Sequence, residues 1–316
     1  SLPGAVFEIR AAEDIYTLDG VMHYAKGEIV DTITTESDGV ASSKELYLGK
    51  YEIQEITTPH GMVLNGAIQT VELTYAGQEV AITETAGNLY NERQKVKVSL
   101  RKVLEQNELF GIGMNGELKN ITFGLYAETD LVAGDGTVIP AGGLIEIVTF
   151  DDNGMATVSA DLPLGSYYLQ ERSTDEHYIL DDTHYEFEFS YGLQETQVIE
   201  ISVNGGDPIK NDLKYGMVSG RKVDEDGHVI ADAIFGLFRN DENEYTAENA
   251  YLTAESAQDG TFKFEKVPFG TWVVREIQSA KGFVLNEKAY PVTVSEDGDV
   301  VNIELENRYI RGNIEG

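Results

Sequence analysis

The feature that most constrains this chain is an eight-residue segment that occurs three times. Each copy begins with a large apolar residue and a Gly, and it ends in a Glu six positions after that Gly. The copies are Leu48–Glu55, Leu164–Glu171 and Phe269–Glu276. A Gly-containing turn precedes each copy by ten or eleven residues, and a Leu follows each Glu nine residues later. This self-similarity predicts three modules that share one structural plan.

Local patterning predicts short antiparallel strands. Apolar and polar residues alternate over short runs, and dipeptides typical of tight hairpin turns separate these runs. The dipeptides are Asp38-Gly39, Asn65-Gly66, Asn153-Gly154, Asp226-Gly227, Asp259-Gly260 and Asp297-Gly298. With 316 residues, the chain can form several domains that each bury a core. We therefore expect an all-β chain with modules at 1–93, 94–213 and 214–311, followed by a tail at 312–316.

A second repeated spacing lies where the modules meet. Asn91 precedes Lys102 by eleven positions, and Asn211 precedes Lys222 by the same number. The last strand of one module therefore leads almost directly into the first strand of the next. No Gly/Ser-rich linker separates them as a flexible tether. We expect a stiff and extended string of domains.

Composition excludes several classes of function. The chain has 55 Asp and Glu against 23 Lys and Arg, and its formal charge of −32 opposes binding to nucleic acid or anionic lipid. It has no Cys, so disulfides and thiolate chemistry are excluded. The sequence has no apolar run of about 18 residues, so it predicts no membrane contact from this stretch. The five histidines lack metal-ligand spacing, and the chain has no catalytic or nucleotide-binding motif. We therefore expect no metal, no cofactor and no substrate turnover.

Strand periodicity places several charged and polar residues on apolar faces. Residues of equal parity share one face of a strand. Each of the following shares a face with apolar neighbours: Glu55, Lys102, Glu171, Glu276 and Asn307. A single such residue is most often solvated at a strand end. Because burying an unpaired ion costs several kcal/mol, repeated inward placement at fixed spacing indicates a chemical role.

A buried Lys, Glu and Asn can together form an amide bond. Burial favours the neutral amine of Lys and the protonated acid of Glu. An amine held against the side-chain carbonyl of Asn can displace ammonia when a carboxylic acid polarises the carbonyl and transfers protons. We expect Glu171 to assist a Lys102–Asn211 cross-link. Glu276 is expected to assist a Lys222–Asn307 cross-link.

At these residues the sequence resembles the B-type repeats of collagen adhesins, which are the CnaB or SpaA-type prealbumin-like domains of Gram-positive surface proteins and pilins. The resemblance covers essentially the whole chain. It includes the family's second strand at Phe7-Glu8-Ile9, Phe123-Gly124-Leu125 and Phe235-Gly236-Leu237. It implies three prealbumin-like, reverse-immunoglobulin-like β-sandwiches in a rod, each with an opening-strand Lys, a central Glu and a closing-strand Asn. The Pro-x-Gly that often follows the Glu is present after Glu55 and absent after Glu171.

The first module departs from this pattern. It matches at Glu55 and Asn91, but no Lys precedes Phe7. Thirteen residues separate Lys222 from Phe235, so the corresponding Lys would lie about six positions before Ser1. Its own lysines, Lys26, Lys44 and Lys50, lie near turns or face outward. We expect Glu55 to lack a lysine partner and the first module to remain unlinked.

The resemblance implies a structural stalk of a Gram-positive surface adhesin or pilin-like protein, with other domains of the parent protein as its partners. Its location would be extracellular and attached to the cell wall, through an anchor outside this stretch. An alternative is a ligand-binding adhesin whose insertions at Asn107–Asn120 or Asp130–Gly143 contact an extracellular-matrix or other surface ligand. A third possibility is a set of accessory domains of an extracellular enzyme.

Overall fold

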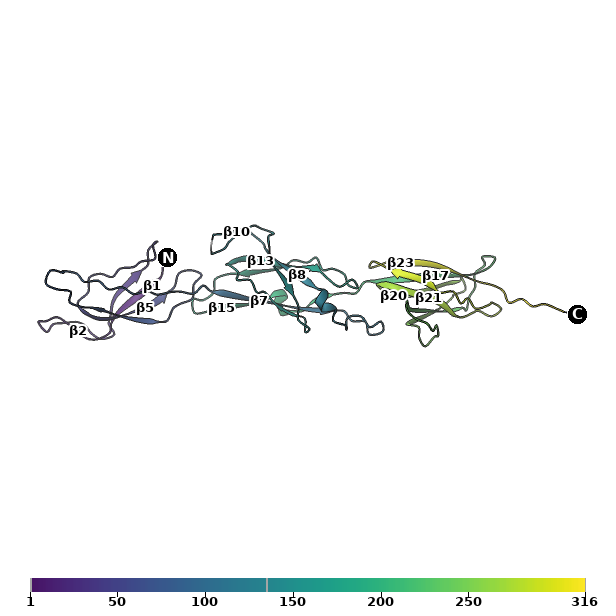
Figure 1. Cartoon of the computed structure of the whole chain (residues 1–316), viewed down its shortest axis with the longest axis horizontal. Helices are drawn as coiled ribbons and strands as arrows, with labels where there is room; N and C mark the ends of the chain where they lie inside the picture. Colours follow the sequence, from purple (N-terminus) through teal and green to yellow (C-terminus); the bar gives the residue numbers. More distant parts are fainter. Residues whose placement is uncertain (1, 135, 316) are drawn as a thin grey trace.

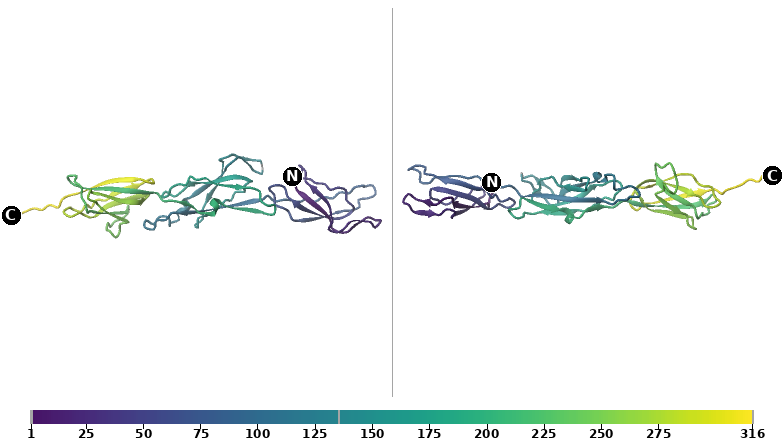
Figure 2. Two further views of the ribbon diagram at one scale, coloured as in Figure 1. Left: turned by 180° about the vertical axis from the view of Figure 1, so that it is seen from behind. Right: turned by 90° about the horizontal axis from the view of Figure 1, so that it is seen from below.

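Three β-rich modules lie end to end in an elongated rod. The computed structural model describes residues 2–134 and 136–315. The modules follow one another in chain order along the long axis, and two further views show the same in-line arrangement (Figures 1 and 2). Besides strands, the described residues form two short 3-10 helices, η1 (Glu117–Asn120) and η2 (Val203–Gly206). No helix among them has the length and apolar character needed to span a bilayer.

The first module contains one four-stranded antiparallel sheet, in the order β4-β1-β5-β6, and a two-stranded β2-β3 pair. Its strands are β1 (Val6–Ala11), β2 (Ile15–Tyr16), β3 (Met22–Tyr24), β4 (Ile29–Thr34), β5 (Gly49–Thr57) and β6 (Ile68–Leu73). Its core of buried residues is small and consists of Ile9, Ala11, Ile15, Val30 and Tyr51. The described segments 35–48 and 74–92 contribute no strand.

The second module contains two sheets, one in the order β11-β8-β13-β14 and one in the order β12-β7-β15, with β16 also paired to β7. Its strands are β7 (Lys95–Leu104), β8 (Thr122–Ala127), β9 (Leu131–Val132), β10 (Val138–Ile139), β11 (Leu144–Thr149), β12 (Met155–Thr157), β13 (Gly165–Ser173), β14 (Tyr185–Phe189), β15 (Val198–Ser202) and β16 (Ile209–Asn211). The inward faces of both sheets enclose a large apolar core.

The third module repeats this plan with sheets in the orders β19-β18-β21-β22 and β20-β17-β23. Its strands are β17 (Tyr215–Asp224), β18 (Ile234–Arg239), β19 (Leu252–Glu255), β20 (Thr261–Pro268), β21 (Gly270–Gln278), β22 (Tyr290–Val294) and β23 (Val300–Asn307). The prediction of an all-β chain built from tandem sandwiches is thus confirmed.

Five of the six predicted turn dipeptides place their Gly at positive φ, where residues with a Cβ are strained. At Gly154 an added Cβ would also collide with the carbonyl oxygen of Lys102. The Asn65-Gly66 dipeptide does not form the predicted hairpin turn, and the Asn65 side chain makes a local Asx turn by accepting from the backbone N–H of Ala67 at 3.0 Å. Gly66 has no positive φ, and the backbone N–H of Asn65 instead donates to the Glu55 carboxylate at 2.7 Å.

The first joint is held by hydrogen bonds between the first two modules. The Gln194 side chain accepts from the backbone N–H of Thr58 at 3.1 Å, and its carbonyl accepts from the N–H of Leu64 at 2.8 Å. The Tyr191 hydroxyl donates to the carbonyl of Met62 at 2.9 Å. Because these bonds engage the backbone on both sides, they restrict bending at the joint.

Apolar contacts support the second joint, together with hydrogen bonds such as that from the Lys214 N–H to the carbonyl of His177 at 2.8 Å. Ile112, Tyr178 and Leu213 form a buried cluster at the end of the second module. Beside it, the Phe110 ring stacks on Tyr251 of the third module with centroids 4.7 Å apart, and it meets Trp272 edge-on at 4.9 Å. The insertion that carries Phe110 therefore supports the neighbouring module.

Candidate cross-link sites

Parallel pairing brings the opening and closing strands of the second and third modules together. Lys102 lies opposite Ile209 in the β7–β16 pair, and Lys222 lies opposite Leu305 in the β17–β23 pair. In both modules the candidate Asn follows two residues after that partner. Since side chains alternate in direction along a strand, this offset points the Lys and the Asn into the same interior.

In the third module the three candidate residues meet in the core. Lys222 Nζ lies 2.5 Å from Asn307 Oδ1 and 3.9 Å from Glu276 Oε1. Asn307 Nδ2 donates to both carboxylate oxygens of Glu276, at 2.9 and 3.0 Å. Each of the three residues is at most 1% exposed. The amine, the amide and the acid are therefore in mutual contact away from bulk water.

The second module has the same arrangement. Lys102 Nζ donates to Asn211 Oδ1 and lies 3.2 Å from Glu171 Oε1. Asn211 Nδ2 donates to the two Glu171 oxygens at 3.1 and 2.9 Å. The Phe123 ring lies beneath the amine, with its centroid 5.5 Å from Nζ. All six predicted residues of these two modules are thus brought together in two buried groups.

Burial changes the acid–base behaviour of both lysines. Removal from water lowers the pKa of Lys102, although the charge of Glu171 opposes this effect. The same desolvation lowers the pKa of Lys222 to about 8, against the opposing charge of Glu276. A substantial share of the Lys222 amine is therefore neutral near physiological pH, which is the state that a nucleophile requires.

Two further contacts recur at each Glu, and sequence reasoning missed both. A hydroxyl three residues after the Glu accepts from the Asn amide, as Thr174 does at 2.9 Å and Ser279 at 3.1 Å. A backbone N–H ten residues after the Glu donates to its carboxylate, from Asp181 at 2.8 Å and Asn286 at 2.7 Å. Their fixed spacing from the Glu in all three repeats was the signal that could have identified them.

An aromatic residue four positions before each Glu fixes the start of the central strand. The Tyr hydroxyl or the Trp indole N–H donates to the carbonyl of the residue four positions earlier in the chain. These bonds run from Tyr51 to Tyr47 at 2.6 Å, from Tyr167 to Pro163 at 2.5 Å and from Trp272 to Pro268 at 2.8 Å. The orientation of each Glu strand is therefore set by the same device.

The first module contains two of the three residues. Glu55 is 2% exposed, and its Oε2 accepts from Asn91 Nδ2 at 2.7 Å. Asn91 also donates to Thr58 Oγ1 at 3.1 Å. Glu55 Oε1, however, is buried without a hydrogen-bond partner. The three lysines of this module are all exposed: Lys26, Lys44 and Lys50.

Among the residues that the structure describes, one cluster of potential metal ligands lies outside these sites. Asp224, Asp226 and His228 place ligand atoms within 4.8 Å of one another. Asp224 already accepts bonds from the backbone N–H groups of Asp226 and His228, both at 2.9 Å, and from the Tyr309 hydroxyl. These hydrogen bonds stabilise a turn, and the turn explains why the three residues lie close together.

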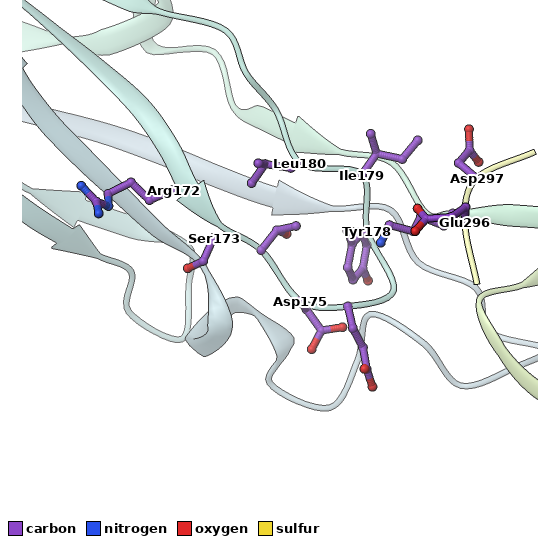
Figure 3. Close-up of a pocket in the computed structure, with 11 residues that line it drawn as sticks. Arg172, Ser173, Asp175, Tyr178, Ile179, Leu180, Glu296 and Asp297 are labelled. Carbon is purple, nitrogen blue, oxygen red and sulfur yellow. The ribbon is translucent and has the colours of Figure 1, made fainter. Parts of the chain in front are cut away.

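A surface pocket of about 540 Å³ lies at the joint between the second and third modules (Figure 3). Residues 172–176 and 178–180 line one side, and Lys214, Glu296 and Asp297 line the other. Thr174 belongs to this lining and also accepts the hydrogen bond from Asn211. The buried group of the second module therefore lies directly behind the wall of an open pocket.

A comparison with solved structures shows a protein of similar fold. The TIE protein of Bacillus anthracis is 21% identical with a TM-score of 0.66, and the alignment covers 97% of this chain and 48% of that one. The present chain thus spans about half the length of that protein. BcpA, the major pilin subunit of Bacillus cereus, is 14% identical with a TM-score of 0.40, and the alignment covers 98% and 96% of the two chains.

No curated protein matches this sequence. The family model of the SpaA prealbumin-like fold domain, in contrast, matches three regions, at residues 1–86, 112–206 and 216–309. These regions contain the sheets β4-β1-β5-β6, β11-β8-β13-β14 and β19-β18-β21-β22. The chain belongs to the SpaA prealbumin-like fold domain family, which it represents three times in succession.

Proposed function

We propose that this chain is a structural stalk of a Gram-positive cell-surface adhesin or pilin-like protein, stabilised by autocatalytic Lys–Asn isopeptide bonds. The observation that carries the proposal is the contact of Lys, Asn and Glu in the cores of the second and third modules. Family membership and the in-line arrangement of the modules support it. The stalk is extracellular and attached to the cell wall, and its partners are other domains of the parent protein or neighbouring surface subunits.

The proposed reaction needs no external reagent. The neutral Nζ of Lys222 attacks the side-chain carbonyl carbon of Asn307, and a new C–N bond forms. Glu276 accepts a proton from the attacking nitrogen and delivers it to Nδ2, the atom that it already contacts at 2.9 Å. The bond between that carbon and Nδ2 then breaks, and ammonia leaves. Glu276 ends in its starting state, and Lys102, Asn211 and Glu171 react in the same way.

Intact-mass spectrometry tests this proposal. The chain should be lighter than its sequence mass by two molecules of ammonia, and peptide mapping should identify Lys102–Asn211 and Lys222–Asn307 as the linked pairs. Glu171→Gln and Glu276→Gln should each prevent one of the two ammonia losses. The amide of Gln keeps the shape of the acid but cannot transfer the proton. Lys263→Ala, at a lysine whose side chain is 62% exposed, should leave both losses intact. A chain with its full sequence mass would disprove the cross-links.

One observation favours an adhesive role as a second candidate. The β9–β10 hairpin projects from the second module (Figure 1), and it exposes Val132 at 64% and Val138 at 58%. Exposed apolar side chains on a projecting hairpin suit contact with another protein. Screening against extracellular-matrix proteins and glycans tests this role. Binding that is lost in the Val132→Ser, Val138→Ser double variant would support it.

A further inference from the structure

The residue ten positions after each Glu connects the carboxylate to the strand that carries the candidate Asn. In the third module this residue is Asn286, whose backbone N–H donates to Glu276 Oε2 at 2.7 Å. Its side-chain Nδ2 donates at 2.8 Å to the carbonyl of Glu306, the residue immediately before Asn307. One residue therefore fixes the carboxyl group and the closing strand relative to each other.

The first module has the same double contact. Asn65 donates from its backbone N–H to Glu55 Oε2 at 2.7 Å. Its Nδ2 donates at 2.8 Å to the carbonyl of Tyr90, which immediately precedes Asn91. In both modules a neutral Asn side chain thus holds the backbone next to the candidate Asn.

The second module has a carboxylate at this position. The backbone N–H of Asp181 donates to Glu171 Oε2 at 2.8 Å, as in the other modules. Its side chain accepts instead of donating, from the backbone N–H of Thr183 at 3.0 Å and the Tyr185 hydroxyl at 2.6 Å. Burial opposes ionisation, but these hydrogen bonds and the charge of Lys102 hold the pKa of Asp181 below its usual value. A fixed negative charge therefore replaces the neutral amide.

This charge acts on the amine of the second module. Desolvation lowers the pKa of Lys102, whereas the charge of Glu171, its hydrogen bond and the charge of Asp181 raise it. In the third module the charges that oppose desolvation of the amine are those of Glu276 and Glu306, and the equivalent Asn adds none. An ammonium group has no lone pair, so a negative charge that stabilises it reduces the supply of nucleophile.

We propose that the residue ten positions after each Glu sets the pH dependence of cross-link formation in its module. Asn286 holds the reacting groups together without adding charge, so the third module reacts at lower pH. Asp181 keeps the amine of the second module protonated until the pH is higher. The inference rests on the Lys–Asn chemistry of the proposed function. Both are positioning residues, because each acts through the Glu, the Lys or the closing strand.

The test compares the pH–rate profile of one bond between wild type and variant. Full-length chain recovered in urea before it has folded is refolded at a series of pH values, and peptide mass spectrometry follows each linked pair. Asp181→Asn should move the profile of the Lys102–Asn211 bond to lower pH by up to about one unit, which makes formation below the midpoint up to about tenfold faster. Asp182→Asn removes an exposed carboxylate one position away and should leave the profile in place.

The reciprocal variant tests the same rule in the third module. Asn286→Asp should move the profile of the Lys222–Asn307 bond to higher pH. Asn243→Asp, which adds the same charge at an exposed position of this module, should not move it. Loss of the bond to the closing strand alone would lower the rate by the same factor at every pH, so only an effect of charge moves the midpoint.

Two results would overturn the inference while the cross-links form normally in the wild-type chain. One is a midpoint that coincides in wild type and both variants, and the other is slowing by a constant factor at every pH. A wild-type chain in which neither pair becomes linked would overturn the proposed function, and this inference with it.

Discussion

The amine of Lys222 lies 2.5 Å from the amide oxygen of Asn307, although 85 positions separate the two residues in the chain. This contact joins the first and last strands of the third module. A covalent bond at this point would close a loop around nearly the whole module. It would therefore restrict the unfolded chain much as a long-loop disulfide does, which is a stabilisation of about 4–5 kcal/mol.

The first prediction concerns the thermal stability of the third module. Lys222→Ala, Glu276→Ala and Asn307→Ala should lower its melting temperature by similar amounts, on the order of 20 °C for a module of this size, because each removes the same bond. Calorimetry measures the change, and reductant should have no effect. Lys263→Ala is the control. A Glu276→Ala chain that melts like the wild type would refute the role assigned to this Glu.

The second prediction concerns pH. Burial lowers the pKa of Lys222 to about 8, so the neutral fraction of its amine should increase from about 1% at pH 6 to about 50% at pH 8. Chain recovered from inclusion bodies in urea, before it has folded and formed the bond, should on refolding form the Lys222–Asn307 bond tens of times faster at pH 8 than at pH 6. Time-resolved peptide mass spectrometry measures the rate. Equal rates at the two values would mean that amine deprotonation does not limit the reaction.

The third prediction concerns the hydroxyl groups that hold the reacting amides. Thr174→Val and Ser279→Ala each remove one acceptor from an Asn amide, which is worth about 0.5–1.5 kcal/mol. Each bond should still form, but up to about tenfold more slowly during refolding. Thr271→Val, at an exposed hydroxyl on β21, should leave both rates unchanged. An unchanged rate in both variants would show that these hydroxyls do not position the amides.

The fourth prediction concerns the second joint. Phe110→Ala removes the ring that stacks on Tyr251 and contacts Trp272. The chain should then bend between its second and third modules, and small-angle scattering should report a shorter maximum dimension. Leu109→Ala, at the exposed neighbouring residue, is the matched control. Unchanged scattering from the Phe110→Ala chain would show that other contacts hold the joint straight.

Much of the fold and the membership of the two complete groups could be predicted from sequence. Side chains alternate along a strand with a period of two, so residue parity alone predicted that Lys102 and Asn307 point inward. The repeat then identified the Glu that accompanies each. A hairpin turn predicted at Asn65-Gly66 does not form, because the N–H of Asn65 is bound by the carboxylate of Glu55, ten residues earlier near the end of β5. Dipeptide preference does not include such a contact. The isopeptide bonds themselves remain predictions.

The contacts between modules could not be predicted in the same way. Phe110 lies in an insertion that the other two modules lack, so the repeat offers no template for its position. Its partners, Tyr251 and Trp272, are more than a hundred residues away in sequence. No periodic pattern links residues across two separately folded cores, because such contacts depend on how the finished modules meet.

The parallel pairing of β17 and β23 also determines how the rod would carry tension. A pull along the axis enters the third module at Tyr215 and leaves at Asn307. With Lys222 bonded to Asn307, this pull would pass along β17 and across one amide. The segment between the two residues, including the whole β19-β18-β21-β22 sheet, would then lie outside the loaded path. The module would resist extension through covalent bonds, and the β19-β18-β21-β22 sheet would carry no load.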